Sequence, residues 1–462
     1  MFDKDFLKEV LDECLKNGAD YAEIYCQDTS NYVLQAIGND VSKIIKSQEY
    51  GAGIRVFNGL IELFASTNDV SKENLLKVAK SLSQSVGKES LNIKYDLKEV
   101  DIKRHVNAKK TRKNFGLDKQ TELVLKGTKA ILDYDKTISQ AVCVLTEADT
   151  LITFANTKGK FYNDNELIIR FSAQAVATDG VVTQTANNNY GYNSGYEIFD
   201  DFDVTAFCTD IASKAVTMLH ADEMVGGDIP VIIHNGFGGV IFHEACGHPL
   251  EASSVSKNLS IFSGKLGEKI ASDLVTAIDD GTLENEWGSS NIDDEGNPTQ
   301  RNVLIENGVL KGYLIDEIGG KRMGLEPNGA GRRESYKYMP TSRMSNTYIA
   351  NGTSTFEEII ANTKYGLFAK SLGGGSVDPS TGEFNFSVLE GYMVIDGRID
   401  KPVRGASIVG NGSDILKRID MVGNNQTFGH GMCGAASGSI PANVGQPTIR
   451  LSHMTVGGKG SK

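Results

Sequence analysis

The stretch that most restricts how this chain can fold is VIIHNGFGGVIFHEACGHPLEA, residues 231–252. It begins with β-branched apolar residues, breaks at Asn235-Gly236 and continues as a second apolar run. This order predicts a strand, a tight turn and a helix. The helix carries His243, Glu244 and His248. These are the groups that a zinc hydrolase needs, because imidazoles hold the metal and a carboxylate deprotonates its water.

The spacing of the two histidines is unusual for a metal-binding helix. At 3.6 residues per turn, residues five apart point about 140° away from each other, against about 40° for the i, i+4 pair of an H-E-x-x-H motif. Gly247 and Pro249 flank His248, and the proline lacks an N–H donor and disfavours helical geometry in the residue before it. We therefore predict a π-type turn or an early helix end that brings His248 beside His243.

The alternative interpretation of this helix is purely structural. A histidine on an apolar helix is most often a core or surface residue, and Cys246 is typical of a small buried hydrophobe. Two histidines, an adjacent glutamate and a helix breaker within a few residues favour the metal site instead.

A zinc ion held by two histidines needs a third protein ligand, since catalytic sites usually supply three. Three other histidines lie in surface-like or pre-strand contexts: His105, His220 and His234. His430 and Cys433 lie in the glycine-rich stretch 428–434. A thiolate between glycines can approach an ion to the Zn–S distance of about 2.3 Å. We therefore predict Cys433 as the third ligand, with one zinc per chain.

Length and charge restrict the class of protein. A chain of 462 residues exceeds the size at which one hydrophobic core keeps growing, so we expect two domains. The pair Gly226-Gly227 follows a helix and marks the predicted boundary between residues 1–225 and 226–462. The net charge is −12 and no long basic run is present, which argues against a nucleic-acid partner.

The sequence also predicts a cytoplasmic protein without a membrane segment. Residues 1–16 are acidic and amphipathic, unlike a signal peptide, and no apolar run approaches 18 residues. The six cysteines are scattered without paired spacing, which favours a reducing compartment over a disulfide framework.

We expect an N-terminal α/β domain with four helices and a series of short strands. The helices are expected at residues 6–15, 71–85, 118–134 and 204–219. Short strand-like runs cover residues 21–25, 32–34, 53–57, 60–64, 138–145, 151–155 and 167–177. Residues 88–114 are interpreted as a polar connection, and residues 183–196 as a polar segment rich in Asn and Tyr.

The C-terminal domain is expected to be β-rich, which makes the whole chain α+β, with the zinc-binding helix enclosed by sheet. Turn dipeptides predict hairpins at Asn58-Gly59 in the first domain and at Asn307-Gly308 and Asp396-Gly397 in the second. Ser354 and Glu357 predict a capping box for a short helix ending at residue 362. Residues 415–419 are a further candidate for a short helix.

Two further motifs have competing interpretations. Asp293-Asp294-Glu295-Gly296 lacks the alternating acidic spacing and distal glutamate of a calcium loop, so we favour a structural turn. Residues 373–376, Gly-Gly-Gly-Ser, lack the Lys-Ser/Thr of a phosphate-binding loop. We expect this run, centred on Gly374, to let the backbone approach a substrate added to a sheet edge.

Several separated motifs together resemble the TldD/PmbA metallopeptidase family. They are residues 243–248 (HEACGH), 293–296 (DDEG), 331–333 (GRR), 433–434 (CG) and 444–447 (VGQP). The resemblance runs nearly end to end, including residues 51–57 and 60–65. It is to the catalytic TldD branch, because the TldE/PmbA branch lacks the metal-binding motif.

This resemblance implies a cytoplasmic zinc peptidase with an α/β N-terminal domain and a β-rich C-terminal domain. Proteins of this kind cleave unfolded peptides, including precursors of ribosomally made peptides. They pair as homodimers or with a TldE/PmbA-like subunit around an enclosed cavity. Carried over by position, the resemblance implies metal ligands at His243, His248 and Cys433 and a catalytic acid/base at Glu244.

The expected mechanism is hydrolysis in which Glu244 accepts a proton from a zinc-bound water and returns it to the leaving amine. His430 or Arg332 would assist the zinc in polarising the attacked carbonyl, and the sequence does not decide between them. The alternative function is a non-catalytic binding or regulatory partner, which the older family label, modulator of DNA gyrase, suggests. The intact Glu244 favours the peptidase, because metal binding alone requires only the ligands.

Overall fold

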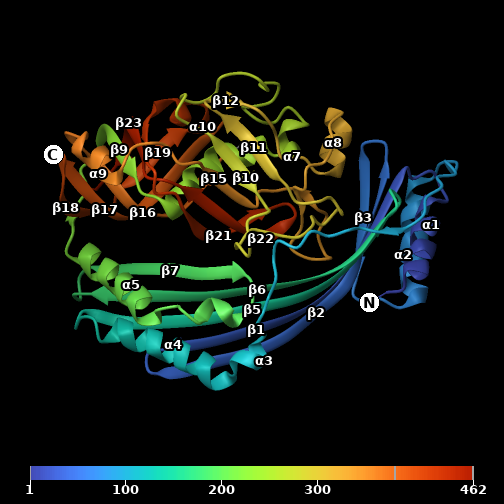
Figure 1. Ribbon diagram of the computed structural model, residues 1–462, viewed down its shortest axis with the longest axis horizontal. Coiled ribbons are helices and arrows are strands. Elements are labelled where there is room, and N and C mark those ends of the chain that lie inside the picture. The colour runs from blue at the N-terminus through green and yellow to red at the C-terminus, as the bar shows by residue number, and fades with distance from the viewer. Residues whose placement is uncertain (1, 379–380, 460–462) are drawn as a thin grey trace.

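The first half of the chain forms one large curved sheet (Figure 1). The computed structural model describes residues 2–378 and 381–459. The strands of this sheet are β1 Tyr21–Ile37, β2 Asp40–Asn58, β3 Ile61–Thr67, β4 Lys98–Glu99, β5 Ile138–Asn156, β6 Lys160–Thr178 and β7 Thr183–Asn193. They pair antiparallel except for β4, which runs parallel to β6. The α/β arrangement that we expected for this half is therefore wrong in detail, since it requires mainly parallel strands joined by helices.

The strands are much longer than the short runs that the sequence pattern predicts. The runs 21–25 and 32–34 belong to the single strand β1, and 138–145 and 151–155 belong to β5. β1 pairs with β2 on one side and with β5 on the other along almost its whole length, so its backbone groups are satisfied where the side chains are polar. The polar segment after residue 182 likewise forms β7 against β6.

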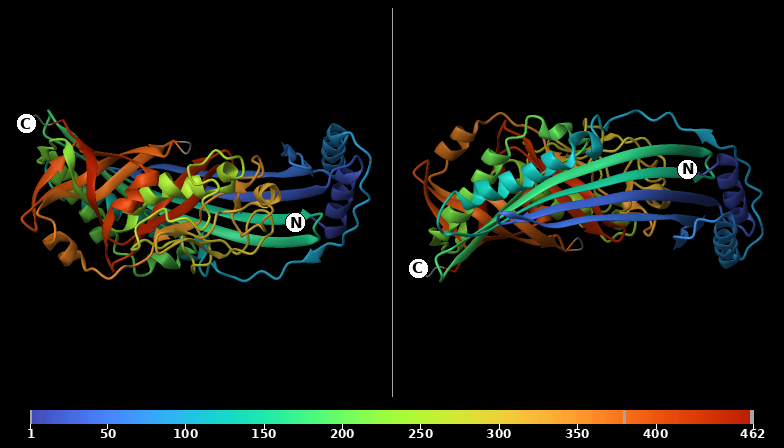
Figure 2. Two further views of the ribbon diagram at one scale, coloured as in Figure 1. Left: turned by 90° about the horizontal axis from the view of Figure 1, so that it is seen from above. Right: turned by 90° about the horizontal axis from the view of Figure 1, so that it is seen from below.

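Helices cover one face of this sheet. They are α1 Lys4–Leu15, α2 Lys72–Val86, α3 Arg112–Phe115, α4 Leu117–Leu132 and α5 Val204–Leu219, with the 3-10 turn Tyr196–Phe199. Residues 22, 24 and 26 of β1 share a core with α1 and α2, and residues 32, 34 and 36 share one with α4 and α5. Because alternate residues of a strand point to one face, both helix pairs lie on the same side, near opposite ends of the sheet (Figure 2).

The second half of the chain lies on the other face of the curved sheet (Figure 1). One of its sheets has the strand order β12-β11-β10-β15-β22-β21. Its strands are β10 Ala277–Asp280, β11 Arg301–Glu306, β12 Val309–Leu310, β15 Asn346–Ile349, β21 Thr427–Ala435 and β22 Gly438–Gln446. A separate two-stranded sheet is formed by β13 Gly331–Arg332 and β14 Thr341–Ser342.

A larger sheet completes the second half. Its strands are β8 Asp222–Glu223, β9 Gly227–Ile233, β16 Tyr365–Val377, β17 Glu383–Ile395, β18 Arg398–Arg404, β19 Ser407–Asn411, β20 Ile419–Val422 and β23 Ile449–Gly457. Five of them, β16, β9, β23, β19 and β17, form a closed ring because β17 also pairs with β16. Besides the helical segment within residues 236–250, the short helices of this half are α7 Ala252–Val255, α8 Glu317–Met323, α9 Phe356–Ala361, α10 Gly412–Ile415 and the 3-10 turn Leu416–Arg418. The protein is therefore of the α+β class.

The expected turns are present, and one turn and one cap are displaced by a residue. The hairpins β11–β12 and β17–β18 turn at the predicted dipeptides, and Asn307 and Asp396 adopt positive φ as such turns require. The β2–β3 turn lies one residue later than predicted, at Gly59-Leu60, because Asn58 still pairs with Ile61. The capping box of α9 is formed by Thr355 and Glu358 instead of Ser354 and Glu357. Among the described residues, no helix combines the length and the apolar character needed to cross a membrane.

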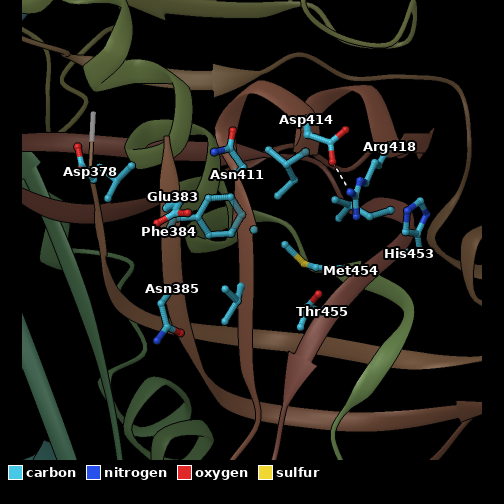
Figure 3. A pocket seen from close by; sticks show the side chains of 15 residues that line it. Asp378, Glu383, Phe384, Asn385, Asn411, Asp414, Arg418, His453, Met454 and Thr455 are labelled. Carbon is cyan, nitrogen blue, oxygen red and sulfur yellow. Dashed lines mark ion pairs between the residues drawn. The ribbon is translucent and has the colours of Figure 1, made fainter. Parts of the chain in front are cut away.

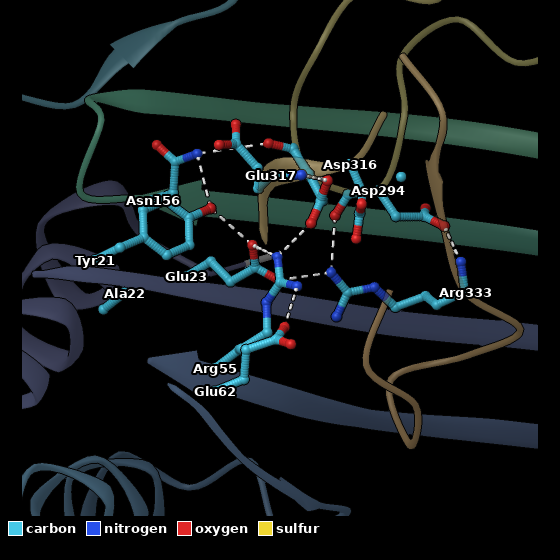
Figure 4. Close-up of polar contacts among 12 residues, drawn as sticks. Tyr21, Ala22, Glu23, Arg55, Glu62, Asn156, Asp294, Asp316, Glu317 and Arg333 are labelled. Carbon is cyan, nitrogen blue, oxygen red and sulfur yellow. Dashed lines mark hydrogen bonds and ion pairs between the residues drawn. The ribbon is translucent and has the colours of Figure 1, made fainter. Parts of the chain in front are cut away.

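Buried ion pairs join the curved sheet to the second half (Figure 4). The guanidinium of Arg55 on β2 contacts Glu23 on β1 and Glu295 of the acidic turn, and Glu23 also lies 2.7 Å from Arg333. All of these side chains are fully buried. Burial opposes ionisation of Glu23, but Arg55 and Arg333 outweigh it and lower the pKa of this carboxyl. Removing one partner would leave a buried charge uncompensated, which makes this contact a strong constraint on how the two halves sit together.

Candidate metal centre

The segment that carries the two histidines is a distorted helix. It begins with the 3-10 turn Gly236–Gly239, continues as α6 Val240–Phe242, and becomes a π-helix over His243–Gly247. The N–H of His248 donates to the carbonyl of His243, which is the i→i+5 bond of a π-turn. The distortion that the histidine spacing predicts is therefore present, and a 3-10 turn, His248–Leu250, follows it.

Two glycines allow this helix to pack closely against its neighbours. A Cβ on Gly239 would come within 2.6 Å of the backbone of Gly445 on β22, so the helix approaches the β21–β22 hairpin directly. A Cβ on Gly247 would come within 2.1 Å of the Sδ of Met344. Both contacts exclude a larger residue, and the contact at Gly239 places the histidine helix directly against the hairpin that carries Cys433.

His243, His248 and Cys433 come together at this junction. Their ligand atoms all lie within 4.8 Å of one another, and they form the one group of three or more His, Cys, Asp or Glu residues suited to a metal in the described part of the chain. The Sγ of Cys433 lies 3.2 Å from the Nε2 of His243 and 3.3 Å from the Nε2 of His248. The histidine helix and the hairpin are far apart in the sequence, and only the tertiary fold brings them together.

The donor set fits a zinc ion. Bonds of about 2.1 Å to nitrogen and about 2.3 Å to sulfur at a tetrahedral angle put the two atoms roughly 3.6 Å apart, so the observed separations need to widen by only a few tenths of an ångström. Two imidazoles and one thiolate are also a ligand set that zinc favours.

The thiol of Cys433 is shifted toward its metal-binding form, whereas His248 would release a proton on binding a metal. Burial raises the pKa of the Cys433 thiol, but the nearby His243 and the hydrogen bonds from His243 and His248 lower it to about 3, so the residue is a thiolate. Burial opposes the charged form of His248, but Glu251 and Cys433 raise its pKa well above the ordinary value. The Nδ1 of His248 lies 3.1 Å from Glu251 Oε1, the carboxylate contact that orients many metal-binding histidines. Glu251 was not predicted from the sequence, although its i+3 spacing from His248 was a usable signal.

Glu244 lies at the edge of the group and is not one of its ligands. Its Oε2 is 3.9 Å from the Nε2 of His248, and its side chain is 23% exposed whereas His243 is buried. A carboxylate that borders the ligands and remains open to water is suitably placed for proton transfer.

The remaining predicted site residues lie outside the ligand group. His430 contacts the carbonyl of Asn189 on β7 through Nδ1 at 3.1 Å, and its ring faces Tyr192 at 5.4 Å. It is three residues from Cys433 on β21, so the two side chains point to opposite faces of the strand. Burial lowers the pKa of His430. Gly374 on β16 is exposed, and a Cβ there would meet nothing within 4 Å.

Arg332 lines a partly open cavity between the curved sheet and the second half. The cavity has a volume of about 420 Å³, and its wall includes Glu166, Arg170, Trp287 and Met432. Arg332 donates from Nη1 to the carbonyl of Met344 at 2.7 Å. Burial lowers its pKa, while the carboxylates of Asp294 and Glu166 oppose that shift. Because Met432 adjoins Cys433 on β21, this cavity lies next to the hairpin that carries the candidate ligand.

A wider groove of about 750 Å³ lies on the ring of strands in the second half (Figure 3). Its labelled polar side chains include Asn385, Asp414, Arg418 and His453, and Asp414 pairs with Arg418. None of the three candidate ligands lines it.

The acidic turn at residues 293–296 is structural. Asp293 accepts hydrogen bonds from the N–H groups of Glu295, Asn297 and Gly331 at 2.7 to 3.1 Å. Burial nevertheless raises its pKa to about 7. The carboxylates of this turn are thus used for backbone and arginine contacts, which agrees with the turn that we favoured over a calcium loop.

The fold and the site together define a class of protein. It is an α+β protein in which a π-turn and a β-hairpin place two histidines, one cysteine and a neighbouring carboxylate in the arrangement of a candidate zinc centre.

Comparison with known proteins identifies the family. Models of PmbA/TldA metallopeptidases match three consecutive parts of the chain, domain 1 at residues 22–85, the central domain at 112–219 and the C-terminal domain at 226–458. The chain belongs to the PmbA/TldD metallopeptidase family.

Two relatives show how far the similarity extends. A protein of Buchnera aphidicola subsp. Acyrthosiphon pisum named metalloprotease TldD homolog is 32% identical over 468 residues, which cover 97% of this chain and 95% of its own length. A protein of Saccharolobus solfataricus named zinc metalloprotease TldD homolog is 31% identical over 302 residues, which cover 64% of this chain and 67% of its own.

Two crystal structures share the fold. A putative modulator of DNA gyrase from Thermotoga maritima superposes with a TM-score of 0.80 at 20% identity, covering 98% of this chain and 99% of its own. TldE from Thermococcus kodakarensis superposes with a TM-score of 0.75 at 19% identity, again covering 98% and 99% of the two chains.

Proposed function

We propose that this protein is a zinc-dependent peptidase that hydrolyses peptide bonds of unfolded peptides or small-peptide precursors. His243, His248 and Cys433 would hold one zinc ion per chain, and Glu244 would be the catalytic acid/base. The observation that carries the proposal is the convergence of three ligand atoms within 4.8 Å beside a carboxylate that is not needed as a ligand. Relatives named metalloprotease over nearly the whole chain length support it.

The residues of this chain divide the chemistry between them. Zinc, when bound, supplies Lewis acidity that polarises the scissile carbonyl and lowers the pKa of the attacking water. Glu251 holds the ring of His248 in place through Nδ1, which leaves Nε2 directed at the metal position. Glu244 accepts a proton from the attacking water and returns it to the leaving amine, because its carboxylate borders the ligands and reaches solvent.

The substrate would be held as an extended strand. Gly374 lies on the stretch of β16 where pairing with β17 is irregular, and it has open space where a side chain would stand. A peptide bound through backbone hydrogen bonds at such an edge requires an unfolded substrate and tolerates many sequences. Arg332 and His430 are proposed to contact the substrate from the side of the curved sheet.

The proposed organisation follows the same family. Residues 1–225 and 226–462 are proposed as two domains, in a cytoplasmic protein with neither nucleic-acid nor membrane partners. It is proposed to pair as a homodimer or with a TldE/PmbA-like subunit, and the shared fold with a protein named TldE supports such a pairing.

Replacing Glu244 by glutamine tests the peptidase directly. Glutamine is nearly isosteric but does not accept the proton at neutral pH, so cleavage of an unfolded peptide should fall by roughly 10²- to 10⁴-fold. Zinc content, measured by atomic emission, should stay at one ion per chain, because the ligands are intact. Binding of the same peptide, measured by fluorescence anisotropy, should also persist.

A matched variant controls for the loss of a surface carboxylate. Glu284→Gln removes a carboxylate in the same half, from a residue outside the ligand group, and should cleave at the wild-type rate. Wild-type cleavage by the Glu244→Gln variant would show that Glu244 is not the base, and the non-catalytic binding or regulatory function would then be favoured.

A further inference from the structure

A fully buried arginine, Arg343, lies beside the hairpin that carries Cys433. Its side chain is 0% exposed, yet no carboxylate among the described residues lies within ion-pair distance of it. This is costly for a guanidinium, because burial without a counter-charge removes its hydration. Its partners are therefore informative: all three are oxygen atoms of the β21–β22 hairpin.

The guanidinium holds both strands of that hairpin. Nη2 donates to the carbonyl of Cys433 itself, and Nη1 donates to Ser437 Oγ at 2.8 Å and to the carbonyl of Gly438 at 2.9 Å. Cys433 is on β21, and Gly438 begins β22. The fork of Arg343 therefore fixes the backbone of the candidate ligand relative to the turn that closes the hairpin.

The residues beside Arg343 contact the histidine helix. The Sδ of Met344 packs where a Cβ of Gly247 would stand, and Ser342 Oγ accepts a hydrogen bond from the N–H of Ser253 at 2.9 Å. Gly247 lies between the two histidines in the π-helix, directly before His248, and Ser253 is in α7, which follows them. The segment Ser342–Met344 thus contacts both the histidine segment and the β21–β22 hairpin, which together supply the candidate metal ligands.

We propose that Arg343 is a positioning residue of the metal centre, which fixes the distance of Cys433 from His243 and His248. This inference rests on the proposed zinc site and extends it to a residue outside the ligand set. A buried guanidinium in place of an apolar side chain is explained by this role, because only a rigid fork with several donors satisfies three oxygens on two strands at once.

The test measures metal affinity in full-length Arg343→Met and Arg343→Lys variants. Zinc affinity is determined by competition with a chromogenic chelator, and cobalt(II) is substituted to record the thiolate-to-cobalt charge-transfer band. Loss of a residue that orients a ligand typically weakens metal binding by roughly 10- to 100-fold. We expect that loss for methionine, a smaller loss for lysine, which keeps the charge, and a weakened or shifted charge-transfer band in both.

Two further variants separate positioning from general destabilisation. Arg333→Lys is the matched control, because Arg333 is equally buried in the same half but bonds Glu23 and Asp294 instead of the hairpin. It should keep wild-type zinc affinity. Ser437→Ala removes one acceptor of Arg343 and leaves the other two, so it should weaken zinc binding by about 2- to 10-fold.

The outcomes distinguish this inference from the proposed function. A wild-type protein that binds neither zinc nor cobalt would overturn the metal site itself. Zinc-binding wild type with unchanged affinity and band in folded Arg343→Met would overturn the positioning role alone. If the Arg343 variants do not fold, Ser437→Ala decides, because unchanged affinity there contradicts the role and a graded loss supports it.

Discussion

Gly247→Ala should destabilise the protein and weaken zinc binding together. The new Cβ would lie 2.1 Å from the Sδ of Met344, which is about 1.3 Å closer than an ordinary van der Waals contact. Met344 cannot retreat easily, since its side chain is fully buried and its carbonyl accepts a hydrogen bond from Arg332. Overpacking of this kind costs ~1–3 kcal/mol. If the strain separates His243 from His248, the same energy weakens zinc binding by roughly 5- to 150-fold.

Trp287 provides the assay for stability. It is the one tryptophan of the chain, and its Nε1 donates to the carbonyl of Gly431 on β21 at 2.7 Å. Its fluorescence in urea therefore reports unfolding of the region that carries the hairpin. Zinc affinity is measured separately by chelator competition. We expect a lower urea midpoint for Gly247→Ala and weaker zinc binding in the same sample.

A double-mutant cycle identifies the cause. Met344→Ala alone should cost ~2–5 kcal/mol by leaving a cavity, but it also removes the atom that the new Cβ strikes. The double variant should therefore be more stable than the two single effects predict, by ~1–3 kcal/mol. Gly434→Ala is the control, because a Cβ there meets nothing within 4 Å although the residue adjoins Cys433. Strict additivity, or an unchanged midpoint and affinity in Gly247→Ala, would refute this account of the helix.

Two predictions concern the thiolate. Cys433→Ser should stay folded by circular dichroism but lose most of its zinc on metal analysis, because a hydroxyl is a poor zinc ligand; full occupancy would exclude Cys433. In the metal-free protein the pKa of Cys433 is about 3, so its thiolate should persist far below the ordinary thiol value of ~8.5 and disappear as the pH falls through the lowered value. Ultraviolet thiolate absorbance at neutral pH that Cys433→Ser lacks would show this, and equal absorbance in the two proteins would contradict it.

Local patterns predicted the helices and turns well. The four longer helices begin and end within a few residues of the predicted positions. Each has an apolar stripe at helical period, and the helix ends where that stripe ends. The hairpin at Asp396-Gly397 was equally predictable, because Asp-Gly is a dipeptide that favours a turn with positive φ at both residues. Both residues adopt positive φ in the structure. The displaced cap of α9 shows the limit: Thr355 and Glu358 repeat the spacing of Ser354 and Glu357 one residue later, and the sequence does not distinguish them.

Strand length was not predictable from local pattern. The middle of β1 carries polar residues such as Gln27 and Asn31, which interrupt the apolar alternation. These positions remain in the strand because β2 and β5 satisfy the backbone on both sides. Pairing between distant segments therefore overrides the side-chain pattern there.

The sequence by itself determined the distorted helix and the chemistry that it carries. The π-turn could be predicted from the i, i+5 spacing of His243 and His248 and from the flanking Gly247 and Pro249. Backbone geometry over a few residues depends mainly on those residues. The tertiary structure decided which side chains meet that helix. Cys433 reaches it through a hairpin held by Arg343, and no local pattern encodes a contact between residues so far apart in the chain. Such contacts depend on packing and strand pairing across the whole fold, so they form only when the complete chain has folded.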